Sequence, residues 1–296
     1  MASLWILVSS LLFALMGVCI KFASAYYSFF ELVAYRGVIG LVFIAVLART
    51  RGGSLRTAYP MMHFWRSAIG VTALMMWFFA LANLPLATGI TLNYTSSLWM
   101  AAILAVTGLV SSGRGVSWRL TAAVLTGFVG VALLLRPTLR QDQLGFGMVG
   151  LLSGMVSAMA YLQVAQLGKV GEPEYRVVFY FSLASLLVGA VGALLSQGGA
   201  LHTHTWHSAG LLLAMGLLAS IAQMALTRAY TFGKPLVNAS LQYAGVIFAS
   251  FFGFVFFGDR LDWLGGLGIV FIIAGGVAAT VFRPRADAPD TVISNA

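Results

Sequence analysis

The chain has 296 residues, of which 60% are hydrophobic and 8% are charged, and its mean hydropathy is +0.94. Because soluble globular proteins carry about 25% charged residues, this composition excludes a soluble globular domain and predicts an integral membrane protein. The formal charge is +9, but the basic residues are spread between apolar runs and form no stripe suited to nucleic acid. A single cysteine, Cys19, excludes an intramolecular disulfide.

Apolar runs separated by charges, glycines and prolines predict ten transmembrane helices, since a helix needs about 20 residues to cross the hydrocarbon core. Long unbroken runs exclude a barrel, whose strands alternate apolar and polar residues. The first five spans are expected at Leu4–Phe22, Phe29–Ala48, Phe64–Ala82, Leu86–Val110 and Trp118–Leu135. The second five are expected at Leu144–Leu167, Val177–Leu195, Trp206–Tyr230, Pro235–Phe257 and Trp263–Phe282.

The two sets of five spans resemble each other in sequence. Leu92-Asn93-Tyr94 matches Leu241-Gln242-Tyr243, and Trp118 opens the fifth span as Trp263 opens the tenth. An odd number of helices in each copy turns the second copy upside down in the membrane. We therefore expect two inverted five-helix repeats around a central cavity, followed by a disordered cytoplasmic tail, with bounds 1–137, 143–284 and 285–296.

The distribution of basic residues between loops predicts the orientation, because cytoplasmic loops retain Lys and Arg. If the N-terminus is cytoplasmic, the inner side holds twelve basic residues: Arg49, Arg51, Arg56, Arg66, Arg114, Arg119, Lys169, Arg176, Arg228, Lys234, Arg283 and Arg285. The outer side then holds four, namely Lys21, Arg136, Arg140 and Arg260. Both termini are therefore predicted to be cytoplasmic.

In these features the chain resembles, over nearly its whole length, the EamA-type branch of the drug/metabolite transporter superfamily. Arg36 stands where that family usually has an arginine, and Leu84-Pro85-Leu86-Ala87 resembles its turn between the third and fourth spans. Gly258-Asp259-Arg260 resembles its glycine and acid after the ninth span, whereas Ser112-Gly113-Arg114 in the first half lacks the acid. The resemblance implies a protein of the bacterial inner (plasma) membrane without a cofactor. It also implies a cavity between the first, third, fourth, sixth, eighth and ninth helices that opens alternately to either side.

Polar residues interrupt the fourth and ninth spans at equivalent positions. Asn238 and Gln242 are four residues apart, so they share one face of a helix. An unpaired amide in hydrocarbon is costly, so these groups contact either the substrate or neighbouring helices. We expect substrate contacts from Asn93, Tyr94, Ser97, Asn238, Gln242 and Tyr243.

Aromatic side chains are the second class of candidate. Rings and methionines form adaptable apolar cavities, although the same residues also serve core packing or lipid contact. The candidates for a substrate-lining role are Phe13, Trp77, Trp99 and Tyr161.

Charged residues constrain the cargo. No carboxylate falls within the middle of a span, which argues against proton-driven export of organic cations. Arg36 is the one basic residue placed clearly within a span, which disfavours phosphorylated cargo, and Glu31 lies near it. These two residues are predicted to form a structural pair or gate. The cluster His202, His204 and His207 has no cysteine or carboxylate nearby, so we expect no metal site.

Phosphate loops, nucleophile elbows and HExxH motifs are absent from the sequence, so we expect no enzyme. The sparse ionic lining predicts a transporter of small neutral or zwitterionic metabolites. Aromatic or hydrophobic amino acids fit best, moved by efflux or facilitated diffusion with alternating access, as in the YddG-like aromatic amino-acid exporters of the family. Uptake of a larger metabolite such as S-adenosylmethionine is the alternative, and a receptor or scaffold without transport is another. The expected partners are a small-molecule substrate and the lipid bilayer, with the chain a monomer or homodimer.

Overall fold

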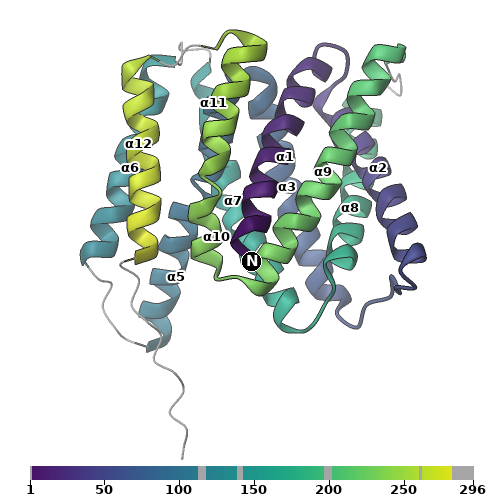
Figure 1. Cartoon of the computed structure of the whole chain (residues 1–296), viewed down its shortest axis with the longest axis horizontal. Helices are drawn as coiled ribbons and strands as arrows, with labels where there is room; N and C mark the ends of the chain where they lie inside the picture. Colours follow the sequence, from purple (N-terminus) through teal and green to yellow (C-terminus); the bar gives the residue numbers. More distant parts are fainter. Residues whose placement is uncertain (1, 113–117, 139–142, 197–201, 260–261, 282–296) are drawn as a thin grey trace, which may run out of the picture.

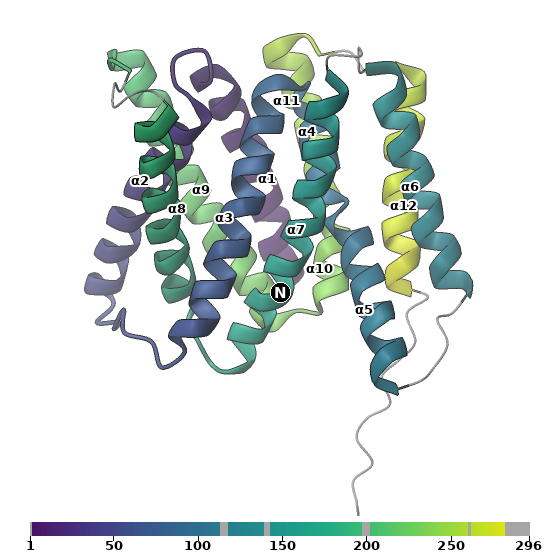
Figure 2. The same ribbon diagram turned by 180° about the vertical axis from the view of Figure 1, so that it is seen from behind.

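The computed structural model describes residues 2–112, 118–138, 143–196, 202–259 and 262–281. Within these ranges the chain is α-helical and contains no strand, and the helices stand side by side as a bundle (Figures 1 and 2). The helices of the first half are α1 (Ala2–Ala23), α2 (Phe29–Thr50), α3 (Pro60–Asn83), α4 (Leu86–Tyr94), α5 (Ser96–Ser112) and α6 (Trp118–Thr138). Those of the second half are α7 (Leu144–Lys169), α8 (Glu174–Ser196), α9 (Trp206–Phe232), α10 (Pro235–Leu241), α11 (Ala244–Phe257) and α12 (Trp263–Val281). The predicted tail, 285–296, lies outside the described ranges.

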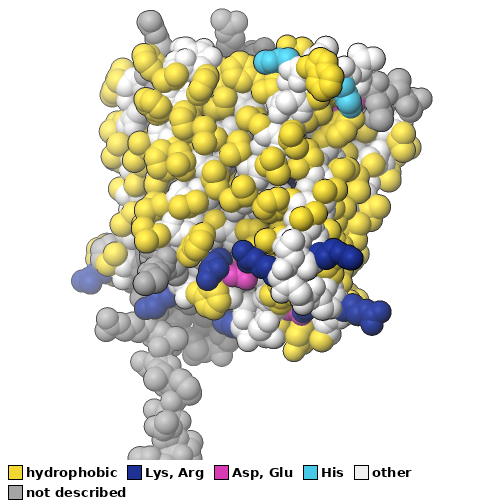
Figure 3. Space-filling model, turned by 45° about the vertical axis from the view of Figure 1, so that its right-hand side comes forward, with side chains coloured by type: hydrophobic (Ala, Val, Ile, Leu, Met, Phe, Trp, Pro, Cys, Tyr) yellow, Lys and Arg dark blue, Asp and Glu magenta, His cyan; other side chains and the backbone are white. Residues whose placement is uncertain are grey.

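The outer surface of the bundle is that of a membrane protein. The described chain holds 8 helical segments long and apolar enough to cross a bilayer, and shorter apolar helices at Thr121–Leu133 and Trp263–Ala278. Side chains such as Val42 and Val46 of α2 are exposed to the surroundings although they are apolar. Figure 3 shows hydrophobic side chains over most of one face, with Lys and Arg in a band near one end and His near the other. We call the first the basic end and the second the opposite end.

The predicted fourth and ninth spans are each divided into two helices, α4 with α5 and α10 with α11. At Thr95, between α4 and α5, the side-chain hydroxyl donates to the carbonyl of Leu92 2.6 Å away. Between α10 and α11, the backbone N–H groups of Tyr243 and Val246 bond to carbonyls three residues earlier, where a regular α-helix would use those four residues earlier. A hydroxyl that returns to the backbone competes with helical hydrogen bonding, and no glycine or proline marks either break. Both breaks lie beside the matched polar residues of the two halves.

The two halves pack against each other through their helices. α1 lies against α9, α3 against α7, α2 against α8 and α6 against α12. Glycines bring α2 and α8 close together, because a Cβ at Gly37 would lie 2.7 Å from the Cα of Leu186 and one at Gly189 would lie 2.8 Å from the Cα of Ala34. Small residues of this kind allow close packing where lipid provides no hydrophobic driving force. The α6–α12 pair stands at one side of the bundle (Figures 1 and 2), so the central site forms among the other helices.

Asp259 connects three helices at the opposite end of the bundle. Gly258 ends α11 with a φ of 64°, which directs the following carboxylate towards α4. Asp259 accepts a hydrogen bond of 2.9 Å from the backbone N–H of Leu86, and its Oδ2 lies 3.6 Å from Nζ of Lys21. Lys21 also donates to the carbonyl of Leu84 at 3.1 Å. The glycine–acid motif therefore fastens α1, α4 and α11 together.

Candidate substrate site

A cavity of about 40 Å³ lies among α1, α2, α3, α4, α7, α8 and α9. Small-molecule sites usually measure about 300–1,000 Å³, so this conformation has room for little more than a water molecule. Any larger cargo requires the surrounding helices to move apart. Of the predicted site residues, the following line this cavity: Phe13, Trp77, Asn93, Tyr94 and Tyr161, together with Arg36.

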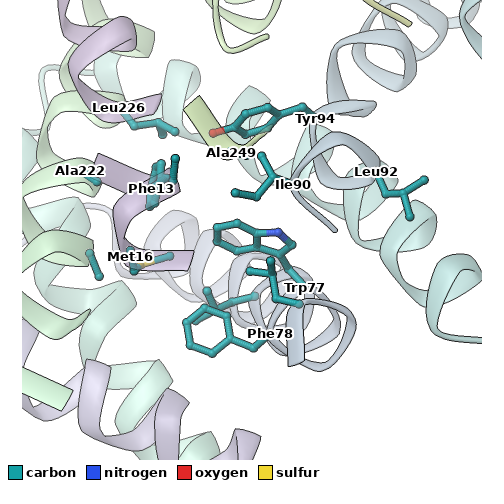
Figure 4. Packing of buried hydrophobic residues seen from close by; sticks show 14 of the residues in the cluster. Phe13, Met16, Trp77, Phe78, Ile90, Leu92, Tyr94, Ala222, Leu226 and Ala249 are labelled. Atoms are coloured by element: carbon teal, nitrogen blue, oxygen red, sulfur yellow. The ribbon is translucent and has the colours of Figure 1, made fainter. Parts of the chain in front are cut away.

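Aromatic rings form one wall of the cavity. The ring of Phe13 meets that of Trp77 edge-on with centroids 6.1 Å apart, and Trp77 meets Phe78 in the same way at 5.9 Å. Figure 4 shows Trp77 between Phe78 and the side chains of Ile90 and Tyr94. The indole Nε1 of Trp77 is buried and lacks a hydrogen-bond partner among the described residues. An apolar wall with an unused donor can accept an aromatic or amphipathic ligand.

Asn93 holds α4 against α7 at the edge of the cavity. Its Nδ2 donates to Ser153 Oγ at 3.0 Å and to Ser157 Oγ at 3.1 Å. Ser157 also lines the cavity. The amide therefore joins two helices and lines the cavity, and its contact with a substrate stays a prediction.

Asn238 and Gln242 do not face one common site, although they are four residues apart. Asn238 Nδ2 donates to the carbonyl of Ala229, near the end of α9. Gln242 Oε1 accepts a hydrogen bond of 3.3 Å from the hydroxyl of Tyr230. Tyr161 stacks on Tyr230 with centroids 5.1 Å apart. Gln242 thus holds Tyr230, which packs against the cavity-lining Tyr161. Asn238 instead satisfies a backbone carbonyl near the end of α9.

The remaining candidates lie between helices and away from the cavity. The hydroxyls of Ser97 and Tyr243 contact each other between α5 and the break before α11. Trp99 packs edge-on against Phe128 of α6 with centroids 4.9 Å apart. These three side chains join the α6–α12 side of the bundle to its centre.

Arg66 is a cavity residue that was not among the predicted site residues. Its charge was counted on the inner side, near the start of the predicted span Phe64–Ala82, whereas α3 starts at Pro60, so Arg66 lies almost two turns inside the helix and is 2% exposed. A Cβ at Gly70, one turn later, would collide with its Nη1 atom. The available signal was this arginine–glycine spacing of four residues, which leaves room for a guanidinium on the helix surface.

Arg36 and Arg66 share one aromatic ring. Their Cζ atoms lie 4.8 and 4.4 Å from the ring centroid of Phe181, and Arg36 Nη1 lies 3.4 Å from Ser185 Oγ. Neither arginine forms an ion pair within the described parts of the chain. A cation–π contact contributes up to about 2 kcal/mol, whereas a buried ion costs several kcal/mol. The cavity therefore carries two uncompensated positive charges, which corrects the expectation of a single intramembrane arginine.

The structure does not bring Arg36 and Glu31 together as a pair. Glu31 closes a capping box with Ser28, whose backbone N–H donates to Glu31 Oε2 at 2.8 Å. The other contact of this carboxylate is with His202, whose Nδ1 lies 2.7 Å from Oε2. A residue in a capping box turns back towards the start of its helix, away from the residue one turn later. Arg36 is therefore left facing the cavity.

A second buried carboxylate lies at the basic end. Glu172, between α7 and α8, is contacted by His63 Nε2 at 3.0 Å, by Thr57 Oγ1 at 2.9 Å and by Arg176 Nη1 at 3.0 Å. Burial raises the pKa of Glu172, but hydrogen bonds from His63, Thr57 and Arg176 outweigh it and hold the pKa below its ordinary value. The carboxylate is therefore ionised at neutral pH and ties the α2–α3 loop to the α7–α8 turn.

Comparison with known proteins identifies the chain as a transporter. No protein-family model matches it. It is 31% identical to the pseudopaline exporter CntI of Pseudomonas aeruginosa over 274 residues, covering 92% of this chain and 91% of the exporter. It is 29% identical to a riboflavin transporter of Vibrio cholerae over 92% of this chain and 91% of that protein. A chain of known crystal structure, at 19% identity, matches 96% of this chain and 99% of its own with a TM-score of 0.69, which shows a shared fold. The chain therefore belongs to the family of bacterial membrane transporters that includes the pseudopaline exporter CntI.

Proposed function

We propose that the protein is a ten-span, alternating-access transporter of the drug/metabolite type, made of inverted repeats at 1–137 and 143–284. The pattern of helix packing supports this proposal. α1 packs on α9 as α7 packs on α3, and α1 packs on α11 as α7 packs on α5. The contact of α2 with α9 likewise has its counterpart in that of α8 with α3. Exchanging the two halves turns each contact into another one, as a two-fold axis in the membrane plane requires.

Reciprocal glycine contacts support the same symmetry. In the α6–α12 pair, a Cβ at Gly130 would lie 2.6 Å from the carbonyl oxygen of Gly268. One at Gly275 would lie 2.6 Å from the backbone nitrogen of Gly127. Each helix thus presents one glycine to the backbone of the other, as Gly37 and Gly189 do in the α2–α8 pair.

Two histidine–glutamate contacts at the two ends of the bundle are the proposed gates. Glu31 joins the start of α2 to His202, which precedes α9. Glu172 joins the α7–α8 turn to His63 near the start of α3. In the proposed repeats α2 corresponds to α8 and α3 to α9, so the two histidine–glutamate contacts occupy equivalent positions. Breaking them in turn would open the cavity first to one side and then to the other.

We place the basic end in the cytoplasm, because cytoplasmic loops retain Lys and Arg. The band of basic side chains in Figure 3 lies near the end that carries the N-terminus and the end of α12 in Figure 1. Both termini are then cytoplasmic, in a bacterial inner membrane.

The proposed cargo is a small metabolite with an aromatic or hydrophobic part, and amino acids of this type are the first candidates, moved by efflux or facilitated diffusion. The observation that carries the proposal is the central cavity, where rings from α1, α3 and α7 meet polar groups from α4 and α9. Relatives named as exporters or transporters of pseudopaline and riboflavin support a metabolite as cargo. Phe13, Trp77 and Tyr161 provide the aromatic surface for its apolar part.

Flux into liposomes tests the proposal. The purified protein is reconstituted and offered labelled tryptophan, phenylalanine, leucine and glutamate, with and without a pH gradient. We expect flux of the aromatic and hydrophobic amino acids without any need for the gradient. Asn93→Ala should reduce it about tenfold, because a polar cavity contact is worth about 1–2 kcal/mol. Asn83→Ala, an exposed asparagine on α3, is the matched control.

Two results would contradict the proposal. Wild-type liposomes that take up none of the four amino acids would remove the assigned cargo. Unchanged flux in Asn93→Ala, with Asn83→Ala also unchanged, would remove the cavity as the site of transport.

A further inference from the structure

Arg36 and Arg66 bring two buried cations to one cavity without an anion to balance them. Arg36 is 3% exposed and Arg66 2% exposed. Arg36 Nε, Arg66 Nε and Arg66 Nη1 are buried and have no hydrogen-bond partner in the described part of the chain. An uncompensated ion in a membrane interior is costly and marks a functional position. Some group that the described residues do not include must offset this cost.

The buried carboxylates of the described chain, Glu31 and Glu172, are already engaged. Glu31 is held by Ser28 and His202, and Glu172 by His63, Thr57 and Arg176. Ser185 offers Arg36 one hydroxyl at 3.4 Å and donates its own hydrogen to the carbonyl of Phe181. Phe181 positions both guanidinium groups but supplies no charge. The missing counter-ion must therefore come from outside the described protein groups.

We propose that Arg36 and Arg66 form an oxyanion site in the central cavity, and that the cargo provides a carboxylate or phosphate group as their counter-ion. This inference rests on the proposed function in using the same cavity, and it narrows the cargo to metabolites that carry a carboxylate or phosphate group. Guanidinium groups suit both anions, since their planar forks donate paired hydrogen bonds to carboxylate and phosphate oxygens.

The rest of the cavity fits an anionic head group attached to an apolar body. Asn93, Ser157 and Gln223 line the same cavity as the arginines and provide further polar groups. Phe13 and Trp77 form the apolar wall on which a ring could stack. No carboxylate lines the cavity among the described residues, so a purely cationic metabolite would find no counter-charge there. The site thus favours a metabolite that carries a carboxylate or phosphate group over a neutral molecule or a cation.

Binding to the purified full-length protein in detergent tests the site without requiring transport. The probes share one aromatic ring and differ in the head group: phenylacetate, phenyl phosphate, phenylethanol and phenylethylamine. A ligand that binds the folded state raises the midpoint of thermal unfolding, Tm, in a saturable way. We expect phenylacetate or phenyl phosphate to raise the Tm, and phenylethanol and phenylethylamine to have little effect. The more effective of the two anions assigns the head group of the cargo.

Variants then locate the site. Arg36→Gln and Arg66→Gln should each abolish the anion-dependent shift or weaken the apparent affinity by at least about tenfold, as expected for loss of a charge-assisted contact. Arg49→Gln, an exposed arginine on the same helix as Arg36, should keep the full shift. If an Arg66 variant does not fold, Gly70→Ala displaces the guanidinium without removing it and serves in its place.

Each outcome bears on the inference. Equal shifts for all four head groups, or an unchanged anion shift in both Arg36→Gln and Arg66→Gln, would overturn the oxyanion site. Anion binding without any flux in liposomes would leave the site standing and contradict the transport proposal. Flux of amino acids without any anion binding would overturn the oxyanion site and leave the transport proposal standing.

Discussion

The guanidinium group of Arg66 occupies the space beside Gly70 that a side chain at this position would fill. The absence of a Cβ at Gly70 is therefore what allows the arginine to lie along its own helix and reach Phe181, with its Cζ 4.4 Å from the ring centroid. Gly70 therefore determines where the charge of Arg66 lies, and this position was not predicted from the sequence.

Gly70→Ala should displace the guanidinium of Arg66 and weaken anion binding about tenfold, a loss of about 1.4 kcal/mol. The measurement is a titration of phenylacetate followed by Tm. The control is Gly145→Ala, since a Cβ at Gly145 in α7 would meet nothing within 4 Å. Anion affinity as high in Gly70→Ala as in the control would show that the position of Arg66 does not matter for binding.

Arg66→Met should make the ligand-free protein more stable, although it removes the proposed binding group. Replacing buried charges with apolar side chains of similar volume often stabilises a protein by about 1–4 kcal/mol. Thermal unfolding of the ligand-free protein measures the effect. Arg49→Met at an exposed site should change stability by less than about 0.5 kcal/mol. A lower Tm for Arg66→Met would mean that the arginine serves the fold.

Glu172→Gln should reduce stability at neutral pH by about 1.5–3 kcal/mol, the value of hydrogen bonds to a charged group. The pKa of Glu172 is lower in the folded protein than its ordinary value of 4.5. Its ionised form therefore contributes stability fully above pH 4.5, and this contribution is lost as the pH falls through the lower folded-state pKa.

Thermal unfolding between pH 7 and pH 3 checks this dependence. The gap between wild type and Glu172→Gln should be constant near neutral pH and close in the acidic range. Glu174→Gln is the control, because Glu174 Oε1 lies 3.7 Å from Arg228 Nε in a pair that is more exposed than that of Glu172. A gap that persists unchanged at pH 3 would show that the carboxylate charge is not the source of the stability.

His202→Ala should favour opening of the end opposite the basic one, because it removes the 2.7 Å contact with Glu31. His63→Ala should favour opening of the basic end by removing the contact with Glu172. The measurement is the reaction rate of a cavity cysteine with a water-soluble thiol reagent added from one side. If both variants raise the rate from the same side, the two contacts do not act as opposite gates.

The sequence predicted the helices better than their rotation about their own axes. Apolar runs of about 20 residues identify spans directly, because the bilayer sets their length. Which face of a helix meets the cavity depends on packing, so Trp77 and Asn93 line it whereas Trp99 and Asn238 do not. The roles of these residues in binding stay predictions.

Charged residues near span ends were the main source of error. Arg66 lies six residues after the start of α3, where hydropathy alone does not separate loop from helix. The separation of Glu31 from Arg36 had a readable signal, since Ser28 and Glu31 have the spacing of a capping box. The breaks at Thr95 and Gln242 had no such signal in the sequence, because neither contains glycine or proline.

Accessibility of the cavity from both faces tests the central claim most directly. Ala73 lines the cavity, and its neighbour Thr72 lies exposed on the outside of α3. Cysteine is placed at either position in a Cys19→Ser background, and reconstituted protein is treated with a membrane-impermeant thiol reagent from each side in turn. We predict that Ala73→Cys reacts from both sides, more slowly when phenylacetate is bound, and that Thr72→Cys reacts from neither. Reaction of Ala73→Cys from one side only, in wild type and in both His202→Ala and His63→Ala, would contradict alternating access to this cavity.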